Sequence, residues 1–589
     1  MKNNISNLDV IKYFLKQLKK LWWLFILSIL STIIVSVLSL LIPIYFKEII
    51  DIISDTSIDK NMMMIEIKKI FYYFIATLFT AFFIWRIFDY VILFWNVKLD
   101  YNISLDSFKY LHKHSYDFFV NNFAWAINKK VWRLVGSMQN LHDIFIRDII
   151  KFIVSLIFII IILIRENLYL WLWFLVWVIA FIIFSIFLNK LRIPFVKNAA
   201  NENSKVAWMY ADTIVNNYNI SVFGSIKKEY DYIKNALNNW VKFEKKSIYM
   251  HIFVFGFLSI ISILWELGLL YFSIKLYFSW SISIWTFVLI ITYQTLLSWQ
   301  IFALSFMLWR ISTNIWNALD MLEILNTPHK IKDFEDAKNL EVKTWKIEFR
   351  NIWFNYNKNV EVFENLNFTI KPWEKVWIVW SSWSWKSSLI KLLFRFYDLS
   401  KWSILIDWQD IFKVTQDSLR SQISIVPQDP ILFHRSLKEN IAYSKENVSE
   451  KELIRVSKLA HCHEFISSLK EWYETLVWER WIKLSGWERQ RVAIARAMLA
   501  DNKIVVLDEA TSALDSESEK LIQDALEKLM WEKTMIVIAH RLSTIMKLDR
   551  IIVLDKWKII EEWTHKELLK KSWVYKKLWD IQSGWFIWE

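Results

Sequence analysis

The stretch 380–388 combines residues that suit phosphate binding. It reads Trp-Ser-Ser-Trp-Ser-Trp-Lys-Ser-Ser, follows the apolar run Val376–Val379 and precedes the helical run Leu389–Phe396. A strand, a loop of small residues, Lys-Ser and a helix form a phosphate-binding loop, in which backbone N–H groups and a helix N-terminus face the phosphates. We expect Lys386 to neutralise the β and γ phosphates of a nucleotide and Ser387 to hold Mg²⁺ through its hydroxyl.

The tryptophans in this stretch do not fit such a loop. The loop requires Gly at positions 380 and 385, where the backbone approaches the phosphates and φ can be positive. Trp380 and Trp385 would place indole rings in the volume that a nucleotide occupies. The sequence is therefore that of a phosphate-binding loop with bulky residues where small ones are required.

A pair of adjacent carboxylates follows a second apolar run. Ile504–Leu507 is typical of a strand and leads directly into Asp508 and Glu509. One carboxylate at such a strand end can support Mg²⁺, usually through water, and the other can polarise the attacking water. The pair is a weak indication by itself, because acidic residues are common at solvated strand ends. Behind a phosphate-binding loop it becomes a strong indication of nucleotide hydrolysis.

A third motif relates the chain to a known family. Residues 484–491 read Leu-Ser-Gly-Trp-Glu-Arg-Gln-Arg and resemble the LSGGERQR signature of ABC transporters, with Trp in place of one Gly. The resemblance extends from Phe354 to Arg541, and the apolar segments before it are arranged like those of half-size exporters. The segments that resemble the family's A-, Q-, X-, D- and H-loops, in the family's order and spacing, are 354–356, 425–429, 477–481, 512–515 and 538–541.

The resemblance implies a role for each matching residue. Tyr356 would stack on adenine, and Glu509 would act as general base. His540 would contact the γ-phosphate. Gln428 would sense the metal and the γ-phosphate and couple them to the membrane region, and Asp508 would support Mg²⁺.

ATP and Mg²⁺ are the cofactors that the resemblance implies. The residues expected at Mg²⁺ are Ser387, Gln428 and Asp508. Those expected to have catalytic roles are Glu509, His540 and Gln428. The residues expected to bind ATP are Tyr356, Trp380, Ser381, Ser382, Trp383, Ser384, Trp385, Lys386, Ser387, Ser388, Gln428, Ser485, Gly486, Trp487, Glu488 and His540.

The signature also implies a second subunit. In this family Ser485 and Gly486 would close over ATP bound by a partner, so each site needs the phosphate-binding loop of one chain and the signature of another. This chain carries one of each. We expect it to pair with a second half-transporter subunit. A homodimer is favoured because the site is close to the family pattern, and a heterodimer with a related chain is the alternative.

The composition places the first half of the chain in a membrane. Hydrophobic residues make up 55% of the 589 residues, and the mean hydropathy is +0.26. With flanking residues counted, each of six apolar segments can cross a hydrocarbon core of about 30 Å. The segments are Leu21–Phe46, Ile70–Val97, Ile149–Ile164, Leu168–Leu188, Ile252–Tyr277 and Ser281–Leu308.

The second half alternates short β-branched runs with helical patterns, which predicts an α/β domain with a largely parallel core sheet. Together with the resemblance to ABC transporters, this pattern implies an all-α six-helix transmembrane domain followed by an α/β P-loop NTPase domain of the ABC type. The expected strands are Val376–Val379, Ile404–Ile406, Ile423–Val426, Ile504–Leu507, Met535–Ile538 and Ile551–Leu554. The expected domains are a transmembrane domain with long cytoplasmic helical extensions (1–325), a linker (326–339) and a nucleotide-binding domain (340–589).

The charge distribution orients the spans. The formal net charge is +13, and Lys and Arg lie mostly beside apolar segments, which favours membrane lipids over nucleic acid as a partner. The long segments between spans two and three and between spans four and five are rich in Lys. By the positive-inside rule these segments, both termini and the nucleotide-binding domain are cytoplasmic, in a multi-pass protein of the cell (inner or plasma) membrane. Residues 1–20 lack the apolar core of a signal peptide, so we expect no cleavage.

The counts of Trp and Gly are unusual. The chain has 37 Trp and 6 Gly, and together they make up about 7% of the residues, the usual share of Gly alone. Trp stands where the family usually has Gly at fourteen positions. These are Trp345, Trp373, Trp377, Trp380, Trp383, Trp385, Trp402, Trp408, Trp472, Trp478, Trp481, Trp487, Trp557 and Trp563.

Two interpretations of these tryptophans compete. Either they are literal and the nucleotide site is blocked, or UGA codons that some bacterial lineages read as Gly were translated as Trp. We favour the second, because Glu509, Gln428 and His540 fit a working site.

The predicted function is ATP-driven export or flipping of a lipid, a drug-like molecule or another amphipathic substrate by a dimeric half-size ABC transporter. The alternative is a catalytically dead ATP-sensing or regulatory membrane protein, if the tryptophans are literal. An importer subunit fits less well, because spans and nucleotide domain share one chain, spans first. No peptidase-sized segment precedes the first span, which disfavours a leader-processing peptide exporter.

Overall fold

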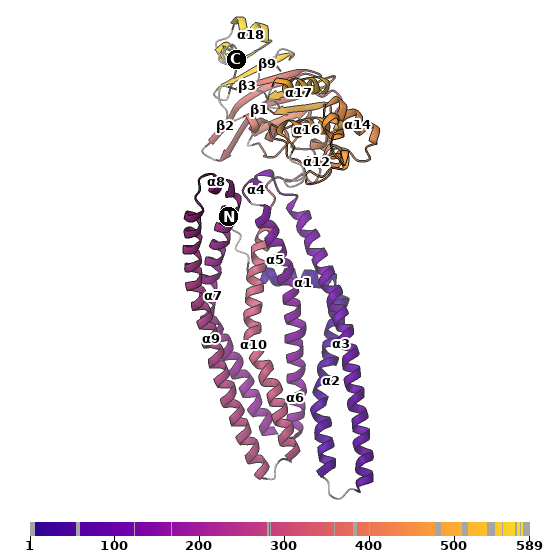
Figure 1. Ribbon diagram of the computed structural model, residues 1–589, viewed down its shortest axis with the longest axis vertical. Coiled ribbons are helices and arrows are strands. Elements are labelled where there is room, and N and C mark those ends of the chain that lie inside the picture. Colours follow the sequence, from indigo (N-terminus) through magenta and orange to yellow (C-terminus); the bar gives the residue numbers. More distant parts are fainter. Residues whose placement is uncertain are drawn as a thin grey trace. The chain divides into compact units, whose positions relative to one another are not determined.

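The computed structural model divides into two compact units (Figure 1). The first comprises Met1–Lys113 and Asn122–Pro328, and the second comprises His114–Asn121 and His329–Glu589. The described residues are 6–54, 59–122, 124–166, 168–279, 282, 284–357, 360–380, 386–399, 401–477, 484–508, 516–538, 548–555, 558–571, 574–577 and 579–580.

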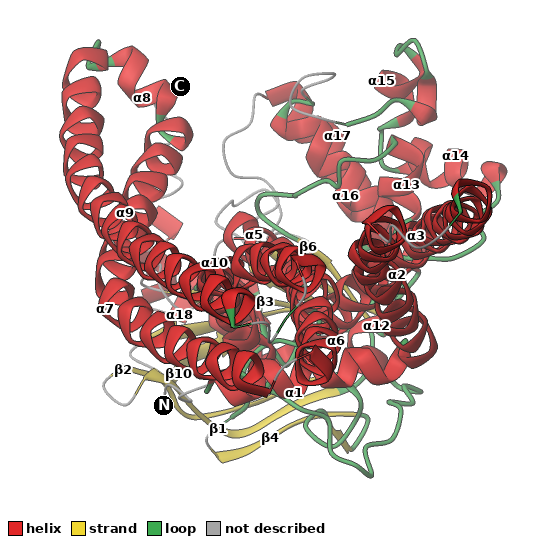
Figure 2. Cartoon of the chain, turned by 90° about the horizontal axis from the view of Figure 1, so that it is seen from below, coloured by secondary structure: helices red, strands yellow, loops and turns green. Residues whose placement is uncertain are grey.

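The first unit is built from long helices, which Figure 2 shows nearly along their axes. Helix α2 packs along α3, α7 packs along α9, and α10 packs against α5, α7 and α9. The helices are α1 (Asn7–Lys20), α2 (Trp22–Ser54), α3 (Lys60–Leu111), α5 (Ala124–Asp143), α6 (Lys151–Glu166), α7 (Leu168–Val215), α8 (Asn217–Val222), α9 (Ile226–Phe278) and α10 (Ile284–Leu325).

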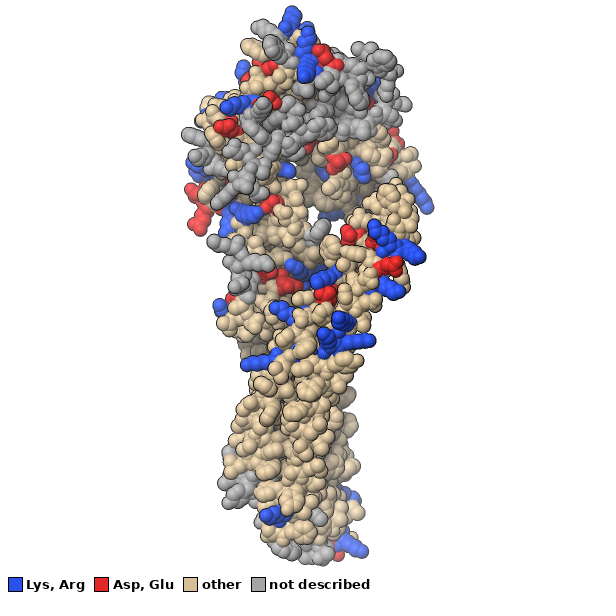
Figure 3. All heavy atoms as spheres, turned by 90° about the vertical axis from the view of Figure 1, so that its left-hand side faces the viewer, with Lys and Arg blue, Asp and Glu red and all other residues tan. Residues whose placement is uncertain are grey.

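Five helices in the described part of this unit are long and apolar enough to cross a membrane: α2, α3, α7, α9 and α10. Figure 3 shows a face of the unit on which a broad belt carries no Lys, Arg, Asp or Glu. Large apolar side chains such as Phe79, Leu264 and Ile183 are more than half exposed. Such a surface is stable against hydrocarbon, because lipid needs no polar side chains to meet it.

An irregular helical segment leads into the third predicted span. Helix α6 has 16 residues and follows without a break from the π-helical segment η1 (Ile144–Ile150), which itself continues α5. Helical backbone therefore runs from Ala124 to Glu166. A π-helical turn offsets the hydrogen-bond ladder by one residue and is a common cause of a kink. Hydropathy alone could not show this offset, since the apolar run is the same for either type of helix.

The strands described in the second unit form two sheets. The smaller is antiparallel, in the order β2 (Val360–Ile370), β1 (Ile347–Asn357), β4 (Lys401–Ile406) and β5 (Gln409–Asp410). The predicted strand Ile404–Ile406 belongs to it. The larger sheet is parallel except for β10, which confirms the predicted core. Its order is β10 (Lys558–Trp563), β9 (Arg550–Asp555), β3 (Lys375–Trp380), β8 (Thr534–Ile538), β7 (Ile504–Asp508) and β6 (Ile423–Val426).

Both faces of the larger sheet are buried. Along β7, Val505 and Leu507 enter one apolar cluster with residues of α16 and α17, while Ile504 and Val506 enter the other with residues of β1 and α11. A strand buried on both faces needs apolar residues throughout. The helices are α4 (Tyr116–Val120), α11 (Lys386–Leu393), α12 (Gln416–Ser421), α13 (Leu437–Ala442), α14 (Glu450–Leu459), α15 (His463–Ser467), α16 (Gly486–Ala500), α17 (Ser516–Leu529) and α18 (His565–Lys571), with the 3₁₀ turn η2 (Trp472–Glu474).

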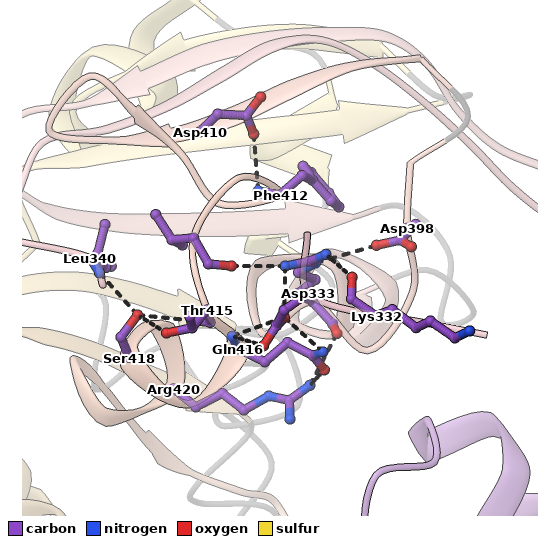
Figure 4. A network of polar contacts seen from close by, with 12 residues as sticks. Lys332, Asp333, Leu340, Asp398, Asp410, Phe412, Thr415, Gln416, Ser418 and Arg420 are labelled. Atoms are coloured by element: carbon purple, nitrogen blue, oxygen red, sulfur yellow. Dashed lines mark hydrogen bonds and ion pairs between the residues drawn. The ribbon is translucent and has the colours of Figure 1, made fainter. Parts of the chain in front are cut away.

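The chain segment after α10 is bound to the α/β unit through Asp333 (Figure 4). Its carboxylate accepts hydrogen bonds from the backbone and side-chain amides of Gln416 at 3.0–3.3 Å and pairs with Arg395 at 3.3 Å. Arg395 is 1% exposed and also donates to the carbonyls of Lys332 at 2.8 Å and Val414 at 2.9 Å. The buried guanidinium is thus fully partnered, and it fixes the end of this segment to the unit.

Candidate nucleotide site

Four neighbouring strands of the larger sheet end at one edge. Trp377 of β3 pairs with Val537 of β8, which pairs with Leu507 of β7, which in turn pairs with Val426 of β6. Because these strands are parallel, their carboxyl ends lie at the same edge, where open α/β sheets bind ligands. The chain segments that start from this edge are the predicted phosphate-binding loop after β3, the H-loop after β8, the carboxylate pair after β7 and the Q-loop after β6.

The backbone around the predicted phosphate-binding loop has the expected order. Trp380 is the last residue of β3, and Lys386 and Ser387 are the first two of α11. A helix N-terminus directly after a central strand presents free N–H groups and a partial positive charge, which suits phosphate. Asp508 ends β7 and is half-buried. The predicted residues Ser381, Ser382, Trp383, Ser384, Trp385, Glu509 and His540 lie outside the described residues.

Tyr356 and Ser388 are brought together from distant parts of the sequence. The hydroxyl groups of the two side chains lie 2.7 Å apart, and Ser388 is 2% exposed within α11. The rings of Phe354 and Tyr397 pack edge-on against Tyr356 at 4.9 and 5.1 Å between centroids. Burial raises the pKa of Tyr356, so its hydroxyl stays neutral. The ring predicted to stack on adenine is therefore held next to α11, the helix that is predicted to bind phosphate.

Lys391 links this tyrosine to α4, a contact that the sequence did not indicate. Its ammonium lies 6.0 Å from the ring centroid of Tyr356 and 5.7 Å from that of Tyr116. Tyr116 also stacks on Phe396 at 5.2 Å with 17° between the ring planes. No local pattern pairs residue 116 with residue 391, since only the tertiary fold brings them together.

Gln428 is exposed just beyond β6, next to a carbonyl that the signature helix binds. The side-chain amide of Gln490, a residue of α16 that is 4% exposed, donates to the carbonyl of Pro427 at 3.2 Å. Sequence reasoning gave Gln490 no role, although it lies within the signature motif. This bond connects α16 to the segment that carries Gln428.

The signature motif begins α16 with a capping box. The hydroxyl of Ser485 accepts from the backbone N–H of Glu488 at 3.3 Å, and a Glu488 carboxylate oxygen accepts from the Ser485 backbone at 2.7 Å. Gly486 follows as the first helical residue, and Trp487 packs against the apolar cluster beneath. The capping box satisfies two backbone N–H groups and fixes the backbone at the start of α16.

Two family models match the chain. The model of the ABC transporter transmembrane region matches residues 25–301, and the ABC transporter model matches residues 363–512. The chain belongs to the ABC transporter family. Members of this family are ATPases coupled to transport, and this transporter, with its apolar helices, is a multi-pass membrane protein of the exporter type.

The transporter resembles curated relatives over two fifths of its length. It is 45% identical over 246 residues to an uncharacterized ABC transporter ATP-binding protein of Haemophilus influenzae. It is 46% identical over 240 residues to an ATP-dependent lipid A-core flippase of Syntrophus aciditrophicus. Each match covers 41% of this chain and 40% of the relative. Identity to ATP-binding cassette sub-family B member 6 of Xenopus tropicalis is 44%, over 27% of that protein's length.

A solved structure matches the transporter over nearly its whole length. It is a bacterial Atm1-family ABC exporter with ATP bound, 27% identical in sequence, with a TM-score of 0.86. The match covers 94% of this chain and 98% of that chain.

Two turns of the transporter have backbone conformations that Trp does not suit. Residues 371–374 read Lys-Pro-Trp-Glu, the backbone N–H of Glu374 donates to the carbonyl of Lys371 at 3.1 Å, and Trp373 has φ 64°. Pro followed by a residue with positive φ defines a type II turn, in which Gly takes the second central position. In the hairpin between β4 and β5, Asp407 and Trp408 have φ 46° and 70°. That is a type I′ turn, for which Asp-Gly is a favoured pair.

A third tryptophan lies in a loop that Asp407 holds. The carboxylate accepts backbone N–H groups of Lys343, Thr344, Trp345 and Lys346 at 2.6–3.1 Å. Trp345 has φ 61°, which lets consecutive N–H groups point at one carboxylate. In η2, Trp472 has φ 48°. All four of these positions are among those where the family usually has Gly.

Proposed function

We propose that this ABC transporter hydrolyses ATP and thereby exports or flips an amphipathic substrate as a dimer of half-size subunits. The observation that carries the proposal is the common edge at which β3, β8, β7 and β6 end, each before one predicted ATP-binding segment. Motif matches alone give the order of these segments. The register adds that they start from adjacent strands.

The residues at this edge fit ATP with Mg²⁺. Lys386 and Ser387 begin a helix after the central strand, Asp508 ends β7, and Gln428 follows the neighbouring strand β6. Oxygen-bearing side chains at this edge suit Mg²⁺, which when bound would neutralise phosphate charge. Glu509 would take a proton from the attacking water.

The capped N-terminus of α16 would close over ATP held by a second subunit. Ser485, Gly486, Trp487 and Glu488 form this end, and the capping box fixes their backbone. ATP would then favour the closed arrangement of the two nucleotide domains, and hydrolysis would release it. Two states that bind ATP unequally are sufficient for alternating access. We place the N-terminus and the nucleotide domain in the cytoplasm, from the positive-inside rule.

The substrate we propose is amphipathic, with lipids included. The uncharged belt of the helical unit supports access from the bilayer. The Syntrophus relative is named a lipid A-core flippase, which agrees with this class.

We further propose that the fourteen tryptophans are Gly in the protein made by the cell. Support comes from Trp345, Trp373, Trp408 and Trp472, whose positive φ costs an L-residue about 1–2 kcal/mol each. The test is to sequence the codons and to measure the intact mass of the native protein. UGA codons and a mass lowered at each position are expected. UGG codons at 380, 383, 385 and 487 would refute the proposal and favour the ATP-sensing alternative.

The function is tested by the ATPase activity of the chain with Gly at the fourteen positions, purified and reconstituted in lipid. We expect hydrolysis that Glu509→Gln lowers by at least about 100-fold, since it removes the general base. Glu446→Gln makes the same chemical change at an exposed residue and should leave the rate unchanged. A folded, dimeric protein that binds ATP without hydrolysing it would contradict the proposal.

A further inference from the structure

Arg192 is a buried cation that lacks an anionic partner. It lies in α7 just beyond the apolar segment Leu168–Leu188 and is 7% exposed. Its Nε atom is fully buried, and within the described residues it has no hydrogen-bond acceptor and no ion-pair partner. Arg310 of α10, by contrast, pairs with Asp148 at 3.0 Å. A buried Nε–H without an acceptor is costly, so an anion that accepts a hydrogen bond from Arg192 would be stabilised here.

The groups around Arg192 can donate to an oxyanion. The guanidinium carbon lies 5.1 Å from the ring centroid of Trp309 in α10, whose indole Nε1 is also buried with no acceptor among the described residues. His251 of α9 lies close enough to interact electrostatically with Arg192. Helices α7, α9 and α10 pack against one another, so one residue from each meets here. Trp309 is not among the fourteen positions proposed as Gly.

The place of these residues along their helices indicates what the anion belongs to. Arg192 follows the apolar run of α7, and His251 directly precedes the apolar run Ile252–Tyr277 of α9. Both therefore lie where a membrane-spanning segment ends. Arg and Trp at this depth meet the headgroup of a molecule whose tail stays in hydrocarbon.

We propose that Arg192, with Trp309 and His251, binds the phosphate or carboxylate group of an anionic amphiphile. The planar guanidinium can donate two parallel hydrogen bonds to such a group, and the indole N–H can donate a third. The inference rests on the proposed export function and assigns a substrate class to it.

Binding measured without nucleotide tests the site independently of ATP hydrolysis. The dimer in phosphatidylcholine nanodiscs is titrated with fluorescent phosphatidic acid, with an equally labelled phosphatidylcholine as the neutral reference. We expect saturable binding of phosphatidic acid alone. Arg192→Gln should weaken it about tenfold or more, because a hydrogen-bonded charge is lost. Lys190→Gln removes the same charge from an exposed residue two positions away and should have no effect.

A second probe and two further variants make the outcome decisive. Labelled glycerol phosphate, which lacks acyl chains, identifies a soluble anion as the occupant if it binds equally well and with the same dependence on Arg192. Arg192→Lys keeps the charge but loses the planar fork, and Trp309→Phe keeps a ring but loses the N–H, so each should weaken binding several-fold. If Arg192→Gln fails to assemble, Arg192→Lys and Trp309→Phe still test whether the site binds the anion.

Equal affinity of the native chain and Arg192→Gln, or an equal loss in Lys190→Gln, would overturn the inference. Anion binding without ATP hydrolysis would contradict the proposed function alone. ATP hydrolysis without anion binding would contradict this inference alone.

Discussion

Tryptophans in the helices of the first unit and four tryptophans in loops and turns of the α/β unit occupy different kinds of backbone. Trp95 of α3 is fully buried and stacks on His142 with 4.2 Å between ring centroids, and Trp177 of α7 is 1% exposed within an apolar cluster. Both belong to helices, where φ is negative. In the α/β unit, Trp373 and Trp408 occupy turn positions with positive φ, and both indoles are exposed.

This contrast shows in which part of a protein the backbone reveals that a residue stands in place of Gly. A helix accepts almost any L-residue at negative φ, so packing decides whether a side chain fits. A tight turn requires φ above zero at a fixed position, and a residue with a Cβ is strained there whatever the space around it. A positive φ at a turn position therefore favours Gly independently of how the side chain packs.

The largest expected effect is in the phosphate-binding loop. Changing Trp380, Trp383 and Trp385 to Gly in the chain as written should raise ATP affinity at least about 100-fold, because Gly at these positions lets the backbone approach the phosphates. Binding of a fluorescent ATP analogue measures this. Changing Trp22, Trp23 and Trp132 of the helical unit, all exposed, is the matched control and should not restore binding.

Trp95→Gly in the helical unit should be strongly destabilising. It removes a buried indole, which costs about 3–5 kcal/mol, and places Gly within a helix. Thermal unfolding in nanodiscs should show a midpoint lower by roughly 10 °C. A higher unfolding midpoint for Trp95→Gly would contradict the proposed difference between the tryptophans of the two units.

Trp408→Gly and Trp373→Gly should each stabilise the protein, by about 1–2 kcal/mol from relief of left-handed strain. The same unfolding measurement detects a midpoint a few degrees higher. Trp408→Ala also removes the indole but keeps a Cβ, so it should stabilise less than Gly. Equal gains for Ala and Gly would mean that the indole, and not the backbone, is the source of strain.

The smallest effect concerns Asp407, which holds the loop of Trp345. Burial raises the pKa of this carboxyl, but hydrogen bonds from Thr344 and from the backbone of Lys343 and Lys346 outweigh it, and the pKa lies below its usual value. A lowered folded-state pKa gives stability that is present above the unfolded pKa near 4 and is lost as pH falls through the folded value. Asp407→Asn should therefore lower the unfolding midpoint at pH 7, and the difference should shrink below pH 4. A difference independent of pH would exclude the carboxylate as its source.

Local patterns were sufficient for much of this fold and failed where distant residues meet. The β-branched runs at 504–507 and 535–538 predicted strands because both faces of the sheet are buried, and the motif order predicted which loops carry ATP chemistry. The antiparallel pairing of β4 and the Gln490–Pro427 bond depend on tertiary contacts that no short window contains. The contact of Lys391 with Tyr116 joins residues that are 275 positions apart in the sequence.

Arg395 and Gln416 form a clamp on Asp333, and this clamp decides where the protein can be recombined with a relative. Because Arg395 and Gln416 hold residues 332–333, an exchanged nucleotide domain that began after them would leave a buried guanidinium facing a foreign segment. A chimaera joined at Pro328 carries the clamp intact, in agreement with the boundary between the units. The short helix α4 belongs with the incoming domain as well, since Tyr116 packs on Phe396. The part of the chain to be exchanged thus consists of two separate stretches of sequence, His114–Asn121 and His329–Glu589.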